Sequence, residues 1–204
     1  MYSGRQRVTE SNFLAQKAYE ADAFLSAAPQ ILWRLYATNY DLEQFGDAIK
    51  WCETGHQRFP QRAAFVECKL LLMLGKAVPP DPDQGWKLVG EIAKLTPKQN
   101  VEVERRSAEM WLAAVLARAN LKDSAKHVIE KARTTPDVDP RGEVMGYEAL
   151  ARTFLGERDA AITLLEKYLT SHPEHRAGFA KVNAWWWRDL QQEPRFKTLA
   201  ASGR

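Results

Sequence analysis

The sequence predicts an all-α protein that is built from repeated pairs of short amphipathic helices. The clearest pair lies between Tyr147 and Pro173, where apolar residues recur three and four positions apart on both sides of Gly156. Such spacing places the apolar side chains on one face of each helix, and the glycine and the proline are typical of a turn and a stop. Weaker copies of the pattern precede it. The small central residues of the four copies are Ala48, Gly85, Ala125 and Ala161, which are 37, 40 and 36 residues apart.

The first predicted helix covers residues 12–27 and ends before Pro29, because proline cannot continue a helix. Its pattern corresponds to the second helix of a pair. It is therefore either an N-terminal cap or the remaining half of a pair that was cut from a longer protein. We expect the second alternative, because the ends of repeat arrays normally carry a polar outer face.

The next three pairs occupy residues 29–60, 63–96 and 96 to about 136. In the second pair, Asp81-Pro82-x-Gln84 predicts an N-cap at which a helix restarts after a long loop. Thr96-Pro97-x-Gln99 has the same form and predicts the start of a long helix that runs to about Ala119. Asn120 is expected to take the left-handed conformation that turns the chain into the paired helix.

The fourth pair is predicted to begin at an Asp139-Pro140 cap and to turn tightly at Gly156 with a positive φ. A last helix is predicted to start near Glu174 and to reach Trp186. Successive helical side chains point about 100° apart, so Trp185, Trp186 and Trp187 cannot share one face. We expect one or two of these rings to cap the core, in preference to a ligand-binding platform.

The motif Trp33-x2-Tyr36-Ala37-x2-Tyr40, followed by Ala48-x3-Cys52 and Pro60, resembles a tetratricopeptide repeat (TPR), as does the stretch from Tyr147 to Pro173. The resemblance implies a TPR-like α-solenoid of about four helix-turn-helix repeats with a C-terminal capping helix. The implied regions are an N-terminal flanking helix at 1–28, a degenerate TPR array at 29–173, and the capping helix with an aromatic tail at 174–204.

The end of the chain combines the aromatic cluster Trp185-Trp186-Trp187-Arg188-Asp189-Leu190 with Glu193-Pro194-Arg195-Phe196. It is similar to the C-terminal TPR region of bacterial multidomain signalling proteins of the serine/threonine kinase or cyclase type. This similarity implies a cytoplasmic regulatory region. The glycine-rich phosphate loop and the His-Arg-Asp and Asp-Phe-Gly motifs of kinases are missing from the sequence, so we expect neither enzymatic activity nor a cofactor.

Charge and hydropathy exclude two further classes of protein. The net charge of +3 comes from 29 basic and 26 acidic residues that are mixed along the chain. Basic pairs such as Arg5/Arg7, Arg58/Arg62 and Arg105/Arg106 are short and separated, which favours solvated helix faces over a nucleic-acid-binding stripe. The longest apolar run, residues 70–74, is far too short to insert into a membrane.

Cysteine and histidine residues give only weak signals. Cys52 and Cys68 lie on neighbouring helices of the repeat pattern, so a bridge between them is geometrically possible. We expect buried free thiols, because the cytosol is reducing. His172 and His175 flank a Pro-Glu dipeptide but lack a third and a fourth ligand, so a solvated loop is favoured over a metal site.

The concave groove formed by the first helices of a TPR array is the surface on which a partner is expected. The residues beside the signature positions are the candidates: Arg34, Thr38, Asp41, Lys69, Met110, Trp111, Arg118, Glu148 and Arg152. Arginine and tryptophan are enriched at interface hot spots, although ordinary solvated helix positions explain the set equally well. We hypothesise that an acidic or mixed-charge protein segment binds to Arg34, Arg118 and Arg152, with Trp111 as an apolar anchor.

Two alternatives complete the predictions. The chaperone-binding TPR proteins grip a terminal carboxylate with lysines and asparagines, but Thr38 and Leu72 stand where those asparagines are expected, which disfavours this client. The chain could instead be a self-association module, a possible homodimer, whose first helix packs against a second copy.

Overall fold

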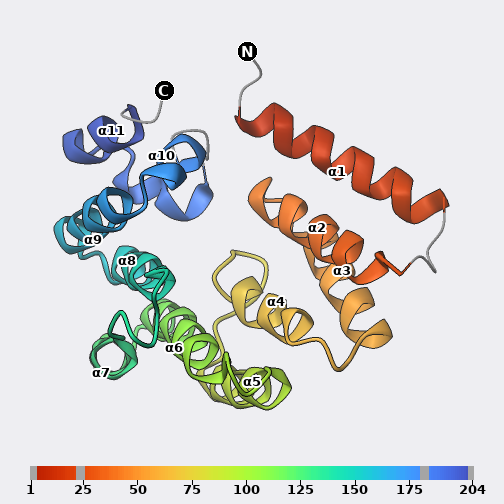
Figure 1. Ribbon diagram of the computed structural model, residues 1–204, viewed down its shortest axis with the longest axis horizontal. Helices are drawn as coiled ribbons and strands as arrows, with labels where there is room; N and C mark the ends of the chain where they lie inside the picture. The colour runs from red at the N-terminus through yellow and green to blue at the C-terminus, as the bar shows by residue number, and fades with distance from the viewer. Residues whose placement is uncertain (1–3, 22–25, 180–183, 202–204) are drawn as a thin grey trace. The chain divides into compact units, whose positions relative to one another are not determined.

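The computed structural model describes residues 4–21, 26–179 and 184–201, and within these ranges helices are the only regular secondary structure (Figure 1). The described elements are eleven α-helices and one 3-10 helix, so the predicted all-α class is confirmed. None of these helices is both long enough and apolar enough to cross a bilayer. The chain divides into two compact units, unit 1 at Met1–Pro79 and unit 2 at Pro80–Arg204.

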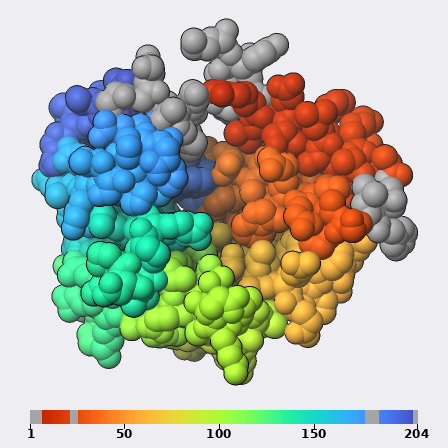
Figure 2. Space-filling view, viewed as in Figure 1, coloured from red at the N-terminus to blue at the C-terminus, as the bar shows by residue number. Residues whose placement is uncertain are grey.

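Unit 1 consists of four consecutive helices. They are α1 (Gly4–Ala21), α2 (Ala28–Asp41), α3 (Phe45–Arg58) and α4 (Ala64–Leu72). Helix α2 is central, since it packs against α1, α3 and α4. Figure 2 shows α1, in red, lying directly on the orange surface of α2. The core of the unit is mainly apolar and includes Leu32, Leu35, Tyr36, Phe65 and Leu70, each at most 1% exposed.

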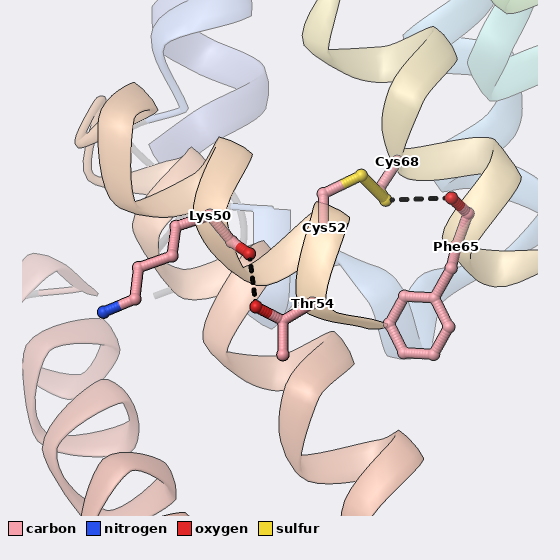
Figure 3. Close-up of a disulfide and its surroundings, with 5 residues drawn as sticks. All are labelled: Lys50, Cys52, Thr54, Phe65 and Cys68. Carbon is pink, nitrogen blue, oxygen red and sulfur yellow. Dashed lines mark hydrogen bonds between the residues drawn. A yellow bond between two sulfur atoms is a disulfide. The ribbon is translucent and has the colours of Figure 1, made fainter. Parts of the chain in front are cut away.

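A disulfide joins α3 to α4 in this core (Figure 3). The Cα atoms of Cys52 and Cys68 are 5.9 Å apart, and neither residue is exposed to solvent. The expectation of two free thiols is therefore wrong. The two helices come together so closely that both side chains point into one small space, which the spacing in the sequence only allowed as a possibility.

Unit 2 contains the remaining elements. They are α5 (Pro82–Leu95), α6 (Val101–Arg118), α7 (Lys122–Ala132), α8 (Glu143–Leu155), α9 (Arg158–Ser171), α10 (Pro173–Phe179), η1 (Trp185–Leu190) and α11 (Pro194–Ala201). Helix α6 packs against α5, α7 and α8, and α8 packs in turn against α9. Every residue of α6 from Ser107 to Ala117 except Glu109 is buried, so this helix forms the centre of the unit.

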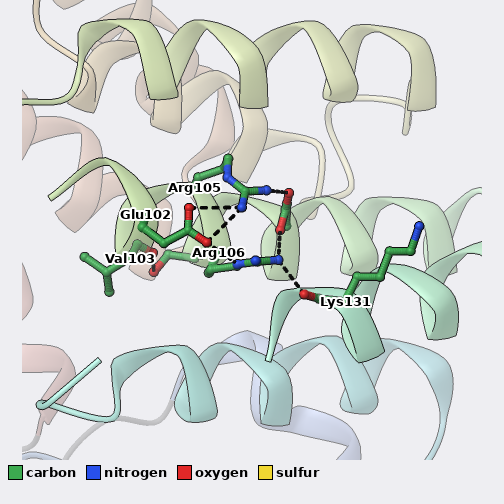
Figure 4. A network of polar contacts seen from close by, with 7 residues as sticks. Glu102, Val103, Arg105, Arg106 and Lys131 are labelled. Atoms are coloured by element: carbon green, nitrogen blue, oxygen red, sulfur yellow. Dashed lines mark hydrogen bonds and ion pairs between the residues drawn. The ribbon is translucent and has the colours of Figure 1, made fainter. Parts of the chain in front are cut away.

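The N-terminal half of α6 carries a network of ion pairs (Figure 4). Arg105 binds Glu102 at 2.9 Å and Glu109 at 2.5 Å. Arg106 binds Glu102 at 2.9 Å and also donates to the backbone carbonyl of Lys131 near the end of α7. Arg106 thus connects α6 to α7.

Most of the predicted turn signals are confirmed. The Asp81 carboxylate accepts a hydrogen bond from the Gln84 backbone N–H at 2.9 Å and caps α5. Asn120 and Gly156 both have left-handed backbones, with φ of 63° and 79°. Asp139 accepts bonds from the backbone N–H groups of Glu143 and Val144 and thereby satisfies the start of α8.

The predicted start of the long helix at Thr96 is wrong. Helix α6 begins at Val101, and no side chain caps it. The Thr96 hydroxyl donates instead to the carbonyl of Ile92, 2.8 Å away, in the last turn of α5. Because that hydroxyl turns back to the preceding helix, it does not cap the following one.

The C-terminal segment differs from the single helix that was predicted. The described part of α10 is short, and η1 holds the tryptophans. Trp187 is the most buried of the three rings, at 9% exposed, whereas Trp186 is only partly buried. Helix η1 packs against α8 and α9, which agrees with a capping role for this segment. The stretch 180–183, through which the predicted helix would run, lies outside the described residues.

Candidate functional site

The predicted groove residues are distributed over both units. Arg34, Thr38, Asp41 and Lys69 belong to unit 1, and the other five belong to unit 2. In unit 2, three of the five are buried, with Met110 0%, Trp111 6% and Glu148 4% exposed. Met110 therefore has no surface to offer a partner. The Trp111 ring meets the Tyr147 ring edge-on at 5.0 Å, so most of its area is already covered within the unit.

Glu148 and Arg152 belong to an ion-pair network that is centred on the buried Glu148 carboxylate. Arg133 and Arg152 each approach Oε1 of Glu148 to 2.8 Å, and Arg152 also binds Glu157 at 2.5 Å. Burial favours a raised pKa for Glu148, but the hydrogen bonds from Arg133 and Arg152 outweigh it and lower that pKa. The guanidinium of Arg152 is thus already occupied by two carboxylates. Arg118, the last residue of α6, is half-buried.

Unit 1 brings together three of its four predicted residues. Arg34, Thr38 and Asp41 line an open pocket of about 620 Å³ between α1, α2 and the start of α4, whereas Lys69 does not. The residues that add charge or aromatic surface to this pocket are Arg7, Trp33, Arg62 and Phe65. We call it the α2 pocket, because α2 supplies most of its wall. Its volume is typical of a small-ligand or peptide-anchor site.

Hydrogen bonds between α1 and α2 hold one wall of the α2 pocket in place. Asn12 donates to the Thr38 hydroxyl at 2.7 Å, and that hydroxyl donates to the Arg34 carbonyl at 2.8 Å. Arg34 in turn donates to the Ser11 hydroxyl at 3.2 Å. Thr38, only 7% exposed, therefore positions the wall and has no free hydroxyl proton for a ligand.

Arg7, Arg34 and Arg62 give the α2 pocket its charge. Within the described part of the chain, none of these three forms an ion pair with a carboxylate. They come from α1, from α2 and from the loop before α4, so the three cations surround the pocket from different sides. Trp33 adds a half-buried indole next to them. Such a site is suited to hold a carboxylate-bearing segment with one apolar side chain.

Asp41 is the one carboxylate among the residues that line the α2 pocket. Burial raises its pKa to about 6. Nearby, the Tyr36 hydroxyl is buried and has no hydrogen-bond partner in the described structure. Burial raises the pKa of Tyr36, and Tyr40, Asp41 and Glu67 raise it further. The C-terminal half of α2 thus carries two polar groups, the Tyr36 hydroxyl and the Asp41 carboxyl, that have no hydrogen-bond partner in the described structure.

Sequence reasoning overlooked Arg7, Arg62 and Trp33 as site residues. Arg7 precedes the predicted first helix, which in the structure begins eight residues earlier, at Gly4 instead of Asn12. Arg62 lies in a loop, where helical periodicity gives no information. The basic pairs Arg5/Arg7 and Arg58/Arg62 were visible, but only the fold shows that one member of each pair lines a shared pocket.

The histidine segment forms a compact aromatic cluster. The Tyr168 ring stacks on His172 at 4.7 Å, and its hydroxyl lies 2.7 Å from Nδ1 of His175. In the described residues, no three His, Cys, Asp or Glu side chains are arranged to hold a metal ion. This cluster connects α9 to α10 through side-chain packing.

No family model, no curated protein and no solved structure matches this chain.

Proposed function

We propose that this protein is a non-catalytic interaction scaffold of the TPR kind, and that its α2 pocket holds an acidic segment of a partner protein. The proposed repeats are α2–α3, α4–α5, α6–α7 and α8–α9, paired by their order in the chain, with η1 as part of the cap. The TPR-like motifs and the alternation of helices support this assignment. By the similarity of its tail, the scaffold would serve as a regulatory region of a bacterial signalling protein in the cytoplasm.

The observation that carries the proposal is that three arginines, none of which pairs with a carboxylate of the described residues, meet around one preformed pocket. Elsewhere in the chain, arginines such as Arg105, Arg152 and Arg195 are matched by glutamates. A carboxylate from a partner would supply the missing counter-charge, and charge-assisted hydrogen bonds contribute about 1.5–3 kcal/mol each. Trp33 would cover an apolar side chain of the same segment.

Rigidity makes such a pocket effective. The Asn12–Thr38–Arg34 hydrogen bonds fix α1 against α2, and the disulfide fixes α3 against α4. A partner segment would therefore bind without first ordering the walls, which lowers the entropic cost of binding. All residues that line the proposed site belong to unit 1, and Met110, which is buried in unit 2, is left out of it.

A binding assay with labelled peptides tests this proposal. Fluorescence anisotropy with acidic peptides should show binding to the wild-type chain. The double change Arg34→Ala with Arg62→Ala should weaken that binding at least about tenfold, because two charge-assisted contacts are lost. The matched control is Lys87→Ala with Lys94→Ala, which removes two exposed cations on α5. Equal affinities for the pocket and control variants would refute the assignment of the site.

Self-association is the second candidate, and one observation favours it. Phe13 and Leu14 on α1 are 57% and 59% exposed, which is unusual for large apolar residues side by side. A second copy could cover them. Light scattering of wild type and of the variant Phe13→Ser with Leu14→Ser tests the idea. A wild-type mass equal to one chain at all concentrations would remove this candidate.

A further inference from the structure

Asp41 is placed where a carboxylate is unfavourable for three separate reasons. It is the last residue of α2, so the negative end of the helix dipole faces it. It is largely removed from water. Its carboxyl also forms neither a hydrogen bond nor an ion pair with any residue in the described ranges. A charged side chain that is unfavourably placed in several respects and has no compensating contact is expected at a functional position.

The surroundings of Asp41 define what its charge would do. Three cations line the same pocket, namely Arg7 from α1, Arg34 from α2, and Arg62 from the loop before α4. Asp41 acts on the buried Tyr36 hydroxyl of α2, and so do Tyr40 of α2 and Glu67 of α4. No titratable side chain of α3 lines the pocket. When ionised, Asp41 therefore places one negative charge among the cations that an acidic ligand needs.

We propose that Asp41 determines the selectivity of the α2 pocket, so that an acidic segment binds well only when the Asp41 carboxyl is protonated. This inference rests on the proposed function, because it concerns the same pocket. Protonation removes the repulsion between Asp41 and the carboxylates of the ligand and leaves the three arginines unopposed. The pocket then becomes a site that prefers anionic segments at mildly acid pH.

The pH range follows from the groups involved. The pKa of Asp41 is raised to about 6, so it changes charge between about pH 5 and 7. Ordinary Asp and Glu side chains of a ligand have a pKa near 4 and stay ionised over that range. The arginines remain charged throughout. Of the described residues that line the pocket, only Asp41 changes its charge in this pH range. A rise in the affinity for an acidic ligand at lower pH would therefore reflect the protonation of Asp41.

Two labelled peptide pools of about eight residues provide the probe. In the acidic pool, alternate positions are Asp or Glu, and in the neutral pool the same positions are Asn or Gln. The remaining positions are an equal mixture of Leu, Phe and Tyr in both pools. For the wild-type chain we expect the acidic pool to bind on the order of tenfold more tightly at about pH 5.5 than at about pH 7.5. This is the effect expected when the repulsion between the Asp41 charge and a ligand carboxylate several ångströms away is removed. The neutral pool should change little.

Three variants isolate the role of Asp41. Asp41→Asn keeps the shape without the charge, so it should bind the acidic pool at high pH as tightly as wild type does at low pH. Asp41→Glu restores a titrating carboxyl and should restore the pH dependence. Glu53→Gln removes an exposed carboxylate of α3 and should behave as wild type. Circular dichroism at both pH values verifies that each variant is folded.

The outcomes separate the two proposals. If the acidic pool binds and Asp41→Asn leaves its pH profile unchanged, the role of Asp41 is refuted while the pocket remains a binding site. If both pools bind equally, the preference for acidic segments is refuted. If neither pool binds the folded wild-type chain at either pH, the proposed function is refuted and the role of Asp41 with it.

Discussion

Gly55 provides the sharpest test of how unit 1 is packed. A Cβ atom at this position would lie 2.1 Å from Cε1 and 2.2 Å from Cδ1 of the Phe65 ring. Real Cβ atoms essentially never lie closer than 3.0 Å to another heavy atom, so the change Gly55→Ala forces the ring to move by about 1 Å or more. The ring has little room to move, since Phe65 is 1% exposed and stacks on Phe59.

The helices around Gly55 cannot easily separate to relieve this clash. Cys52, three residues before Gly55, is bonded to Cys68, three residues after Phe65. Overpacking in such a core costs about 1–3 kcal/mol, and we expect the upper half of this range. Replacing a helical glycine by alanine returns about 0.5–1 kcal/mol. The expected net loss in the free energy of unfolding is therefore about 1–2 kcal/mol.

Urea unfolding followed by circular dichroism measures this loss as a lower transition midpoint. Gly46→Ala is the matched control, because it adds the same methyl group to the same helix with no atom within 4 Å. The control should be neutral or slightly stabilising. Combining Gly55→Ala with Phe65→Leu should recover part of the loss. Equal midpoints for Gly55→Ala and Gly46→Ala would refute the packing described for α3 and α4.

Four further predictions concern stability. Removal of the disulfide by Cys52→Ser with Cys68→Ser should cost about 3 kcal/mol for a loop of 16 residues, measured by the same urea assay with and without reductant. Glu148→Gln should cost about 3 kcal/mol in the same assay, since it leaves Arg133 and Arg152 without their buried partner, whereas Glu20→Gln breaks only an exposed pair and should cost under about 1 kcal/mol. The folded state holds the Asp41 proton more tightly than the unfolded state, so stability should fall as pH rises from about 4 through about 6, and urea midpoints across that range should show a flatter profile for Asp41→Asn. Gly156→Val should lower the melting temperature by an amount that corresponds to about 1 kcal/mol or more, because valine strains at a φ of 79°.

The helix boundaries could be predicted wherever the residue at the boundary has only one common structural role. Gly156 and Asn120 ended their helices as expected because few other residues accept a left-handed backbone. Asp81 capped α5 because its short carboxylate reaches the Gln84 backbone N–H in the first turn. Thr96 failed as a cap because a threonine hydroxyl can also bond backwards within its own helix, and here it does so. Sequence alone does not show which of these two bonds forms.

The candidate site could be predicted only in part, because the burial of a side chain depends on how many neighbouring helices pack against its own helix. Met110 and Trp111 stand beside the repeat signature and were expected on a free face of α6. In the structure α6 is surrounded by α5, α7 and α8, so that face is covered. Arg34 and Asp41 lie on α2 near the start of the chain, where α1 leaves the pocket open. Periodicity identifies the faces of a helix, but it does not show how many of them are packed.

The contrast between matched and unmatched arginines is the strongest argument that the α2 pocket is a binding site. Around α6, α8 and α9, glutamates lie within 3 Å of Arg105, Arg152 and Arg195, so the chain is able to neutralise its own cations. In the α2 pocket a carboxylate is present, yet Asp41 forms no ion pair with the arginines that share the pocket. If the three arginines served only the stability of unit 1, pairing one of them with Asp41 would relieve both charges. The arginines and Asp41 instead line one open pocket without pairing, so the cations remain available to a carboxylate that comes from outside the chain.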